Sequence, residues 1–148
     1  FEEPMLVALP QHHRLGGRKR LNLSELAQER WMLGTAEACP DAGRFEQACH
    51  AAGFDPDIAF HNDDYTAVLG FVAAGVGVAP VPEMVARNAP RGVRICALHG
   101  VKVSRPICAV MPAGYQSRAA RAMVGVLEEV SEQWLAAGAP TQAAIAAA

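Results

Sequence analysis

The chain has 148 residues, of which 51% are hydrophobic and 19% charged, a composition typical of one compact domain with its own core. Its formal net charge of -2 argues against a nucleic-acid-binding surface, because displacing counterions from phosphates requires clustered cations. No apolar run reaches the roughly 18 residues needed to span a bilayer, and the opening Phe-Glu-Glu-Pro has no basic signal-peptide region. We therefore expect a cytoplasmic protein without a membrane partner.

Strands and helices alternate along the chain. The predicted elements are, in order, a strand at 4–9, a loop at 11–20, a short helix at 22–30, a strand at 31–34, a helix at 41–52, a strand at 57–61, a helix ending at Gly75, a strand at 76–81, a helix at 82–87, strands at 93–98 and 105–111, and a closing helix at 117–137. This alternation favours an α/β fold with a largely parallel sheet. The alanine-rich tail after Gly138 is expected to fray or to extend the helix.

Capping residues set the helix boundaries. Asn22 and Glu25 have the spacing of a capping box, in which each side chain satisfies an amide of the first turn. Asn62 or Asp63 is predicted to cap the helix that Gly75 ends.

The four cysteines indicate neither disulfides nor a metal site. They are widely separated, with no C-x-x-C pair and no zinc-like spacing to histidine, and are expected to be reduced and mostly buried: Cys39, Cys49, Cys96 and Cys108. The sequence also has no G-x-S-x-G or H-E-x-x-H motif and no convincing acid pair. We therefore expect no enzyme activity, no cofactor and no metal.

Three segments resemble the effector-binding domain of LysR-type bacterial transcription regulators. In chain order they are MLVALPQHHRLGGRKRLNLSELAQERWMLG, ACHAAGFDPDIAFHNDDYTAVLGFVAAGVGVAPVPEMVA and VRICALHGVKVSRPICAVMPAGYQSRAARAMVGVLEEV. The second is the most specific, because the helix end AAGF, the NDD helix start and VAAGVGVAPVP occur in the family's order. Together the segments cover residues 4–132.

The resemblance implies a periplasmic-binding-protein-like (type II) fold, with two α/β lobes joined by crossing strands around a ligand cleft. On this mapping 1–11 hold a first-lobe strand and the first crossing, 12–100 form the second lobe, 101–137 form the return crossing and the closing helix of the first lobe, and 138–148 are a flexible tail. The family's helix-turn-helix and most of its first lobe have no counterpart here. Because the strand at 4–9 would otherwise have unpaired edges, and the chain begins at Phe1, we expect a longer chain or neighbours gained by assembly.

Candidate ligand-binding residues follow the predicted strands, because open α/β sheets bind ligands beyond the carboxyl ends of their strands, where amides and helix starts favour anions. Thr35 and Ala36 follow one strand, and the Thr35 hydroxyl is suited to a carboxylate or sulfate; an ordinary turn threonine is the alternative. Asn62 and Asp63 follow another strand, with helix capping as the alternative. Tyr65 forms either a wall of the site or simple surface packing.

Two further patterns favour ordinary structure over a site. Gly75-Val76-Gly77 contains a G-x-G, but it ends a helix and opens a strand, the reverse of a phosphate loop. Close backbone packing explains it better, and the resemblance places Val76 beside the cleft. His12 and His13, next to several basic residues, permit a metal or phosphate site, although a solvated basic face is the preferred interpretation.

The resemblance implies the ligand-sensing and oligomerisation domain of a LysR-type regulator. A small anionic effector would bind between the lobes, and its differential affinity for two arrangements would change DNA binding by a dimer or tetramer. DNA contacts would come only from a helix-turn-helix domain outside this sequence. A periplasmic-type solute-binding protein of a transporter, which needs a secretion signal, and an enzyme on the same scaffold are the alternatives.

Overall fold

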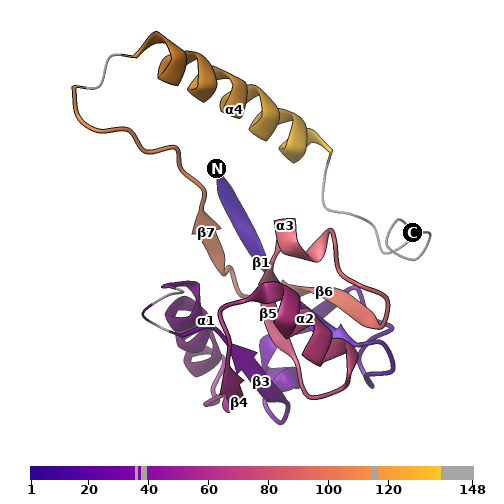
Figure 1. Cartoon of the computed structure of the whole chain (residues 1–148). Helices are drawn as coiled ribbons and strands as arrows, with labels where there is room; N and C mark the ends of the chain where they lie inside the picture. Colours follow the sequence, from indigo (N-terminus) through magenta and orange to yellow (C-terminus); the bar gives the residue numbers. More distant parts are fainter. Residues whose placement is uncertain (36, 38–39, 115–116, 138–148) are drawn as a thin grey trace.

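A computed structural model describes residues 1–35, 37, 40–114 and 117–137, which form a mixed α/β structure (Figure 1). In chain order the elements are β1 (Glu2–Pro10), β2 (Arg20–Asn22), the 3-10 helix η1 (Leu23–Leu26), β3 (Arg30–Leu33), α1 (Pro40–Ala51), β4 (Asp57–His61), α2 (Tyr65–Ala73), β5 (Ala79–Pro82), α3 (Glu83–Ala86), β6 (Val93–His99), β7 (Ser104–Pro106) and α4 (Arg118–Ala136). The predicted site residue Ala36, Cys39 and the tail at 138–148 lie outside the described residues.

Strand β1 lies in the middle of the main sheet, whose order is β2-β6-β1-β5. Its second half runs antiparallel to β5 and β6, while its first residues pair antiparallel with β7. Among the described residues, the parallel pairs of strands are β2 with β6 and β3 with β4, and a parallel bridge from Trp31 to Val78 joins β3 to the segment before β5. The prediction of a largely parallel sheet is therefore wrong. An apolar run reports that both faces of a strand are buried, but it says nothing about the direction of the neighbouring strands.

The two faces of β1 build two cores, because successive side chains of a strand point to opposite faces of the sheet. Met5, Val7 and Leu9 pack in one core with residues of α1, η1 and β3, including Trp31 and Phe45. Leu6 and Ala8 pack on the other face, where the cluster contains the apolar side chains of α2 and α3. Helices therefore cover both faces of the sheet, as expected for an α/β fold.

Two predicted elements are shorter than expected. The helix predicted at 22–30 is only η1, because the chain turns after Leu26, where the Glu29 amide donates to the Leu26 carbonyl. Asn22 itself belongs to strand β2, which pairs with β6. The strand predicted at 105–111 ends at Pro106. Beyond it, Ile107 still exchanges backbone hydrogen bonds with Phe1, but the described part of the chain places no strand beside the following residues. Val110 is accordingly 88% exposed.

Helix α4 lies apart from the sheet, beside the start of β1 (Figure 1). The rings of Phe1 and Trp134 lie 5.4 Å apart, and the Arg87 guanidinium carbon is 3.8 Å from the centre of the Trp134 ring. None of the described side chains of α4 is fully buried, and its apolar residues remain about half exposed: Met123, Val126, Leu127, Val130 and Leu135. The helices in the described part of the chain include none with the length and apolarity that crossing a bilayer requires.

Candidate functional site

The turns that follow β3 and β4 meet at one edge of the structure, because parallel strands end on the same side. The Asn62 amide donates to the Leu33 carbonyl at 2.8 Å, and His61 Nδ1 lies 3.1 Å from the Gly34 carbonyl oxygen. Asp63 accepts from the Thr35 amide at 2.7 Å, and from the Thr35 hydroxyl at 3.1 Å through Oδ1 and 3.0 Å through Oδ2. Three of the predicted site residues, Thr35, Asn62 and Asp63, are thus brought together.

The three polar residues before α2 have separate roles. Asp64 is the N-cap, and its Oδ1 accepts from the Thr66 amide at 2.8 Å. Asn62 Oδ1 accepts from the Asp64 amide at 2.8 Å, which tightens the turn. The prediction that Asn62 or Asp63 caps this helix is wrong by one or two positions. Asp63 is consequently free of any capping role, and its carboxylate bonds to Thr35.

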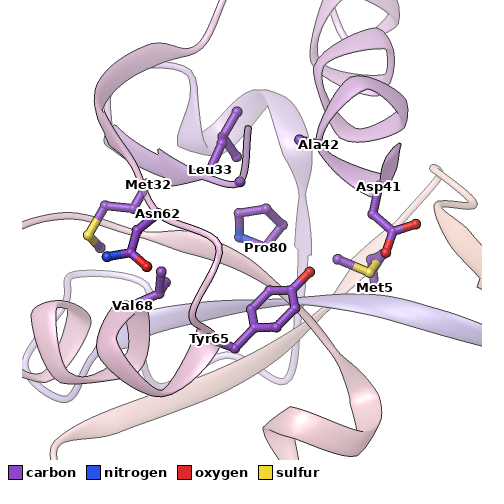
Figure 2. Close-up of a pocket in the computed structure, with 10 residues that line it drawn as sticks. Met5, Met32, Leu33, Asp41, Ala42, Asn62, Tyr65, Val68 and Pro80 are labelled. Atoms are coloured by element: carbon purple, nitrogen blue, oxygen red, sulfur yellow. The ribbon is translucent and has the colours of Figure 1, made fainter. Parts of the chain in front are cut away.

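A small hollow opens beside these turns, with a cavity volume of about 10 Å³, which is room for about one water molecule, so a larger guest requires the surrounding side chains to move apart. Figure 2 shows Asn62 on one side and Asp41 on the other, with Tyr65 between them. The apolar part of the lining comes from β1, β3, α1, α2 and β5: Met5, Met32, Leu33, Ala42, Val68 and Pro80. The hollow therefore combines an apolar wall with a few polar groups, the usual makeup of a small-molecule site.

Val76 lies away from this hollow. It follows the carboxyl end of α2, and its amide donates to the Phe71 carbonyl, whereas Asn62 precedes the start of the same helix. A nine-residue helix is about 13 Å long, so the two predicted site residues are separated by at least that order of distance. The structure thus groups Val76 with neither Thr35 nor Asn62.

A buried ion-pair network adjoins the hollow. Glu3 is completely buried; its Oε2 accepts from Arg105 Nε at 2.6 Å, and its Oε1 accepts from the Met84 amide at 2.6 Å. Arg105 Nη1 lies 3.4 Å from Oδ2 of Asp41, a lining residue. Burial alone would lower the pKa of Arg105, but the hydrogen bond and the charge of Glu3 outweigh it and keep the pKa above its ordinary value. The guanidinium is therefore charged.

Sequence reasoning missed Asp41 and Arg105. Asp41 lies in the first turn of the predicted helix that follows the Thr35 turn, and that position next to a candidate site residue is the signal for it in the sequence. Arg105 is 102 positions from Glu3, and no local pattern marks that contact.

The basic side chains of the loop at 11–20 form surface ion pairs with nearby glutamates. Arg14 Nη2 lies 2.9 Å from Glu29 Oε1, His13 Nε2 lies 3.2 Å from the same oxygen, and Arg18 pairs with Glu25. Within residues 1–35, 37, 40–114 and 117–137, no three His, Cys, Asp or Glu side chains gather as metal ligands.

Comparison with known proteins identifies the family. Residues 1–132 match the family described as the LysR substrate binding domain. The HTH-type transcriptional regulator YybE of Bacillus subtilis is 31% identical over 111 residues, which cover 73% of this chain and 35% of that protein. The chain spans about a third of the length of the curated relatives that it matches.

Solved structures show the same fold. The LysR family transcriptional regulator CbnR has a TM-score of 0.75 at 23% identity, over 87% of this chain and 45% of that chain. The regulatory domain of CcmR from Synechocystis PCC6803, solved in complex with 2-PG, has a TM-score of 0.71 at 16% identity, over 88% of this chain and 64% of that chain. These likenesses confirm the expected periplasmic-binding-protein-like α/β fold, and the chain belongs to the LysR substrate binding domain family.

Proposed function

We propose that this chain is the ligand-sensing part of a LysR-type bacterial transcription regulator and that it binds a small effector in the hollow between Asn62, Tyr65 and Asp41. The observation that carries the proposal is the meeting of the β3 and β4 turns beside that hollow, with Thr35 and Asp63 hydrogen-bonded at its edge. The relatives are transcription regulators, which supports a binding role rather than a catalytic one.

Three of the predicted site residues keep a place in this proposal. Asn62 would contact the effector directly, while Thr35 and Asp63 would hold the two turns in position. Ala36 follows Thr35 in the sequence and is proposed on that ground alone. Val76 is not among the described residues that line the hollow, so it has no part in this proposal.

The proposed domain organisation follows the same family. Residues 12–100 would form the second lobe, and the antiparallel pair of Glu2–Pro4 with Ser104–Pro106 would be the two crossing strands. Helix α4, whose apolar residues stay half exposed, would belong with a first lobe. The whole regulator would be a cytoplasmic homo-oligomer that binds DNA through a helix-turn-helix domain, and an effector that prefers one arrangement of the lobes would change that binding.

The proposal is tested in the full-length protein by screening small molecules for thermal stabilisation and measuring the best binder by calorimetry. Replacing Asn62 with Ala should weaken binding by about 5- to 10-fold, the effect of one or two hydrogen bonds. The matched control is Asn88→Ala, because the Asn88 side chain donates, among the described residues, just to the Met84 carbonyl at a long 3.5 Å and does not line the hollow. Equal affinities for the two variants would contradict the proposed site.

A further inference from the structure

Arg105 has hydrogen-bonding capacity that its contacts with the described residues leave unused. A guanidinium carries five N–H donors on three nitrogens. Nε is satisfied by Glu3 at 2.6 Å, and Nη1 has only the 3.4 Å contact with Asp41. No described residue accepts from Nη2, and the side chain is 24% exposed, so solvent and small solutes reach it.

This unused capacity lies next to the proposed site. Asp41 lines the hollow together with Tyr65, and its Oδ2 lies 3.4 Å from Arg105 Nη1. Met5, another lining residue, follows the β1 residues that pair with β7, where Arg105 is opposite Glu3. The guanidinium is therefore at the edge of the hollow where the two proposed crossing strands run.

Glu3 fixes the position of Arg105. Its carboxylate is fully buried and holds both Arg105 Nε and the Met84 amide at short distances, so it is unsuited to exchange partners. The Asp41 contact differs, because it is long and Asp41 lies in the first turn of α1, where the helix dipole stabilises a carboxylate without Arg105. Of the two carboxylates beside Arg105, Asp41 is the one that a ligand can replace.

We propose that Arg105 binds a carboxylate of the effector through Nη1 and Nη2, taking the place of Asp41. The planar fork of these two nitrogens matches the two oxygens of a carboxylate, which makes this class of anion the preferred guest. The inference rests on the proposed function, since it concerns the same hollow. It adds that the effector is negatively charged and that Arg105 binds its charged group. Because Arg105 belongs to β7, replacement of Asp41 by the effector would also change the contacts of that strand directly.

The inference is tested by replacing Arg105 and Asp41 in turn, because the two substitutions should change the affinity for acids in opposite directions. Malonate and succinate serve as probes in the full-length protein, with malonamide and succinamide as neutral counterparts, and binding is measured by calorimetry. Arg105→Gln should weaken binding of the acids by about 10-fold or more, the usual effect of losing hydrogen bonds to a charged group. Asp41→Asn should strengthen it by about 5-fold, because a competing carboxylate has gone. The amides should respond to neither change.

Arg44→Gln is the matched control. Arg44 lies in α1 and donates to the Ser104 carbonyl at 3.2 Å, so it adjoins the same strand with the same charge but does not line the hollow. Its replacement should leave acid binding within two-fold, in contrast to Arg105→Gln. Because loss of Arg105 leaves Glu3 buried without its partner, Asp41→Asn, which removes no buried group, provides the answer if Arg105→Gln does not fold.

The outcomes separate this inference from the proposed function. Weaker or unchanged acid binding in Asp41→Asn would overturn the exchange at Arg105, as would equal binding of acids and amides by the unaltered protein. If Asn62→Ala still weakened the best binder of the screen, the proposed function would stand without the inference. Failure of every screened compound to bind would overturn both.

Discussion

Thr35 and Asp63, which are 28 positions apart in the sequence, are joined by an amide hydrogen bond of 2.7 Å and by a hydroxyl proton shared between the two carboxylate oxygens, at 3.1 and 3.0 Å. Both donors of Thr35, the amide and the hydroxyl, go to one carboxylate. The bonds tie the turn after β3 to the turn after β4, so neither turn moves without the other. A ligand that touches Asn62 therefore acts on both turns at once.

A double-mutant cycle measures this link. Asp63→Ala removes both the amide bond and the shared hydroxyl bond and should lower the free energy of unfolding by about 1 kcal/mol, whereas Thr35→Ala removes only the hydroxyl bond and should cost less. The two changes should be non-additive, since either one breaks the hydroxyl bond. Chemical denaturation of the two single variants and the double variant gives the values, and strict additivity would show that the link contributes nothing.

Two glycine-to-alanine replacements should have opposite effects. A Cβ at Gly77 would lie 2.3 Å from the Arg30 carbonyl oxygen, so Gly77→Ala should lower the free energy of unfolding by about 2 kcal/mol or more. At Gly43, inside α1, a Cβ meets nothing within 4 Å, and alanine should raise stability by about 0.5–1 kcal/mol. Urea denaturation of both variants measures the two changes in the free energy of unfolding. No change for Gly77→Ala would refute the close packing of β3 against the segment before β5.

Glu3 should be far more important for stability than its neighbour Glu2. Glu3→Gln breaks a buried charge pair with Arg105 and should lower the free energy of unfolding by about 2–3 kcal/mol, less than the largest values because Arg105 is partly exposed. Glu2 is exposed, and within the described part of the chain its carboxylate accepts from the Ser104 hydroxyl alone, so Glu2→Gln should cost under about 1 kcal/mol. Similar losses in the two variants would contradict this network.

The buried thiols should make the protein sensitive to alkali. Burial raises the pKa of Cys49 to about 12 and that of Cys96 to about 11, above the ordinary value of 9.0. Above pH 9 the unfolded chain releases these protons while the folded chain keeps them, so stability falls as pH rises from 9 towards 11. Denaturation at pH 8 and pH 10 should show this loss, and a Cys49→Ala, Cys96→Ala double variant should show less of it. An unchanged pH dependence in that variant would contradict the assignment.

The sequence predicted the elements that have strong local signals. The apolar stripe around Phe45 and Cys49 identified α1 almost to the residue, and the AAGF and VAAGVGVAPVP segments indicated the family. Strand β2 was missed because three residues carry too little pattern, and it forms only because Leu21 pairs with Leu98 across the sheet. The antiparallel pairing of β1 and the Glu3 to Arg105 ion pair could not be predicted, because both depend on contacts between residues roughly 70 to 100 positions apart in the chain.

The effector hollow is tested most directly by intermolecular nuclear Overhauser effects between a bound effector and labelled methionine methyl groups. Met5 and Met32 line the hollow from opposite sides (Figure 2), whereas Met123 lies on α4 and does not line it. We expect contacts from the effector to the methyl groups of Met5 and Met32 and none to that of Met123. Contacts to Met123 without any to Met5 or Met32 would show that the effector binds elsewhere.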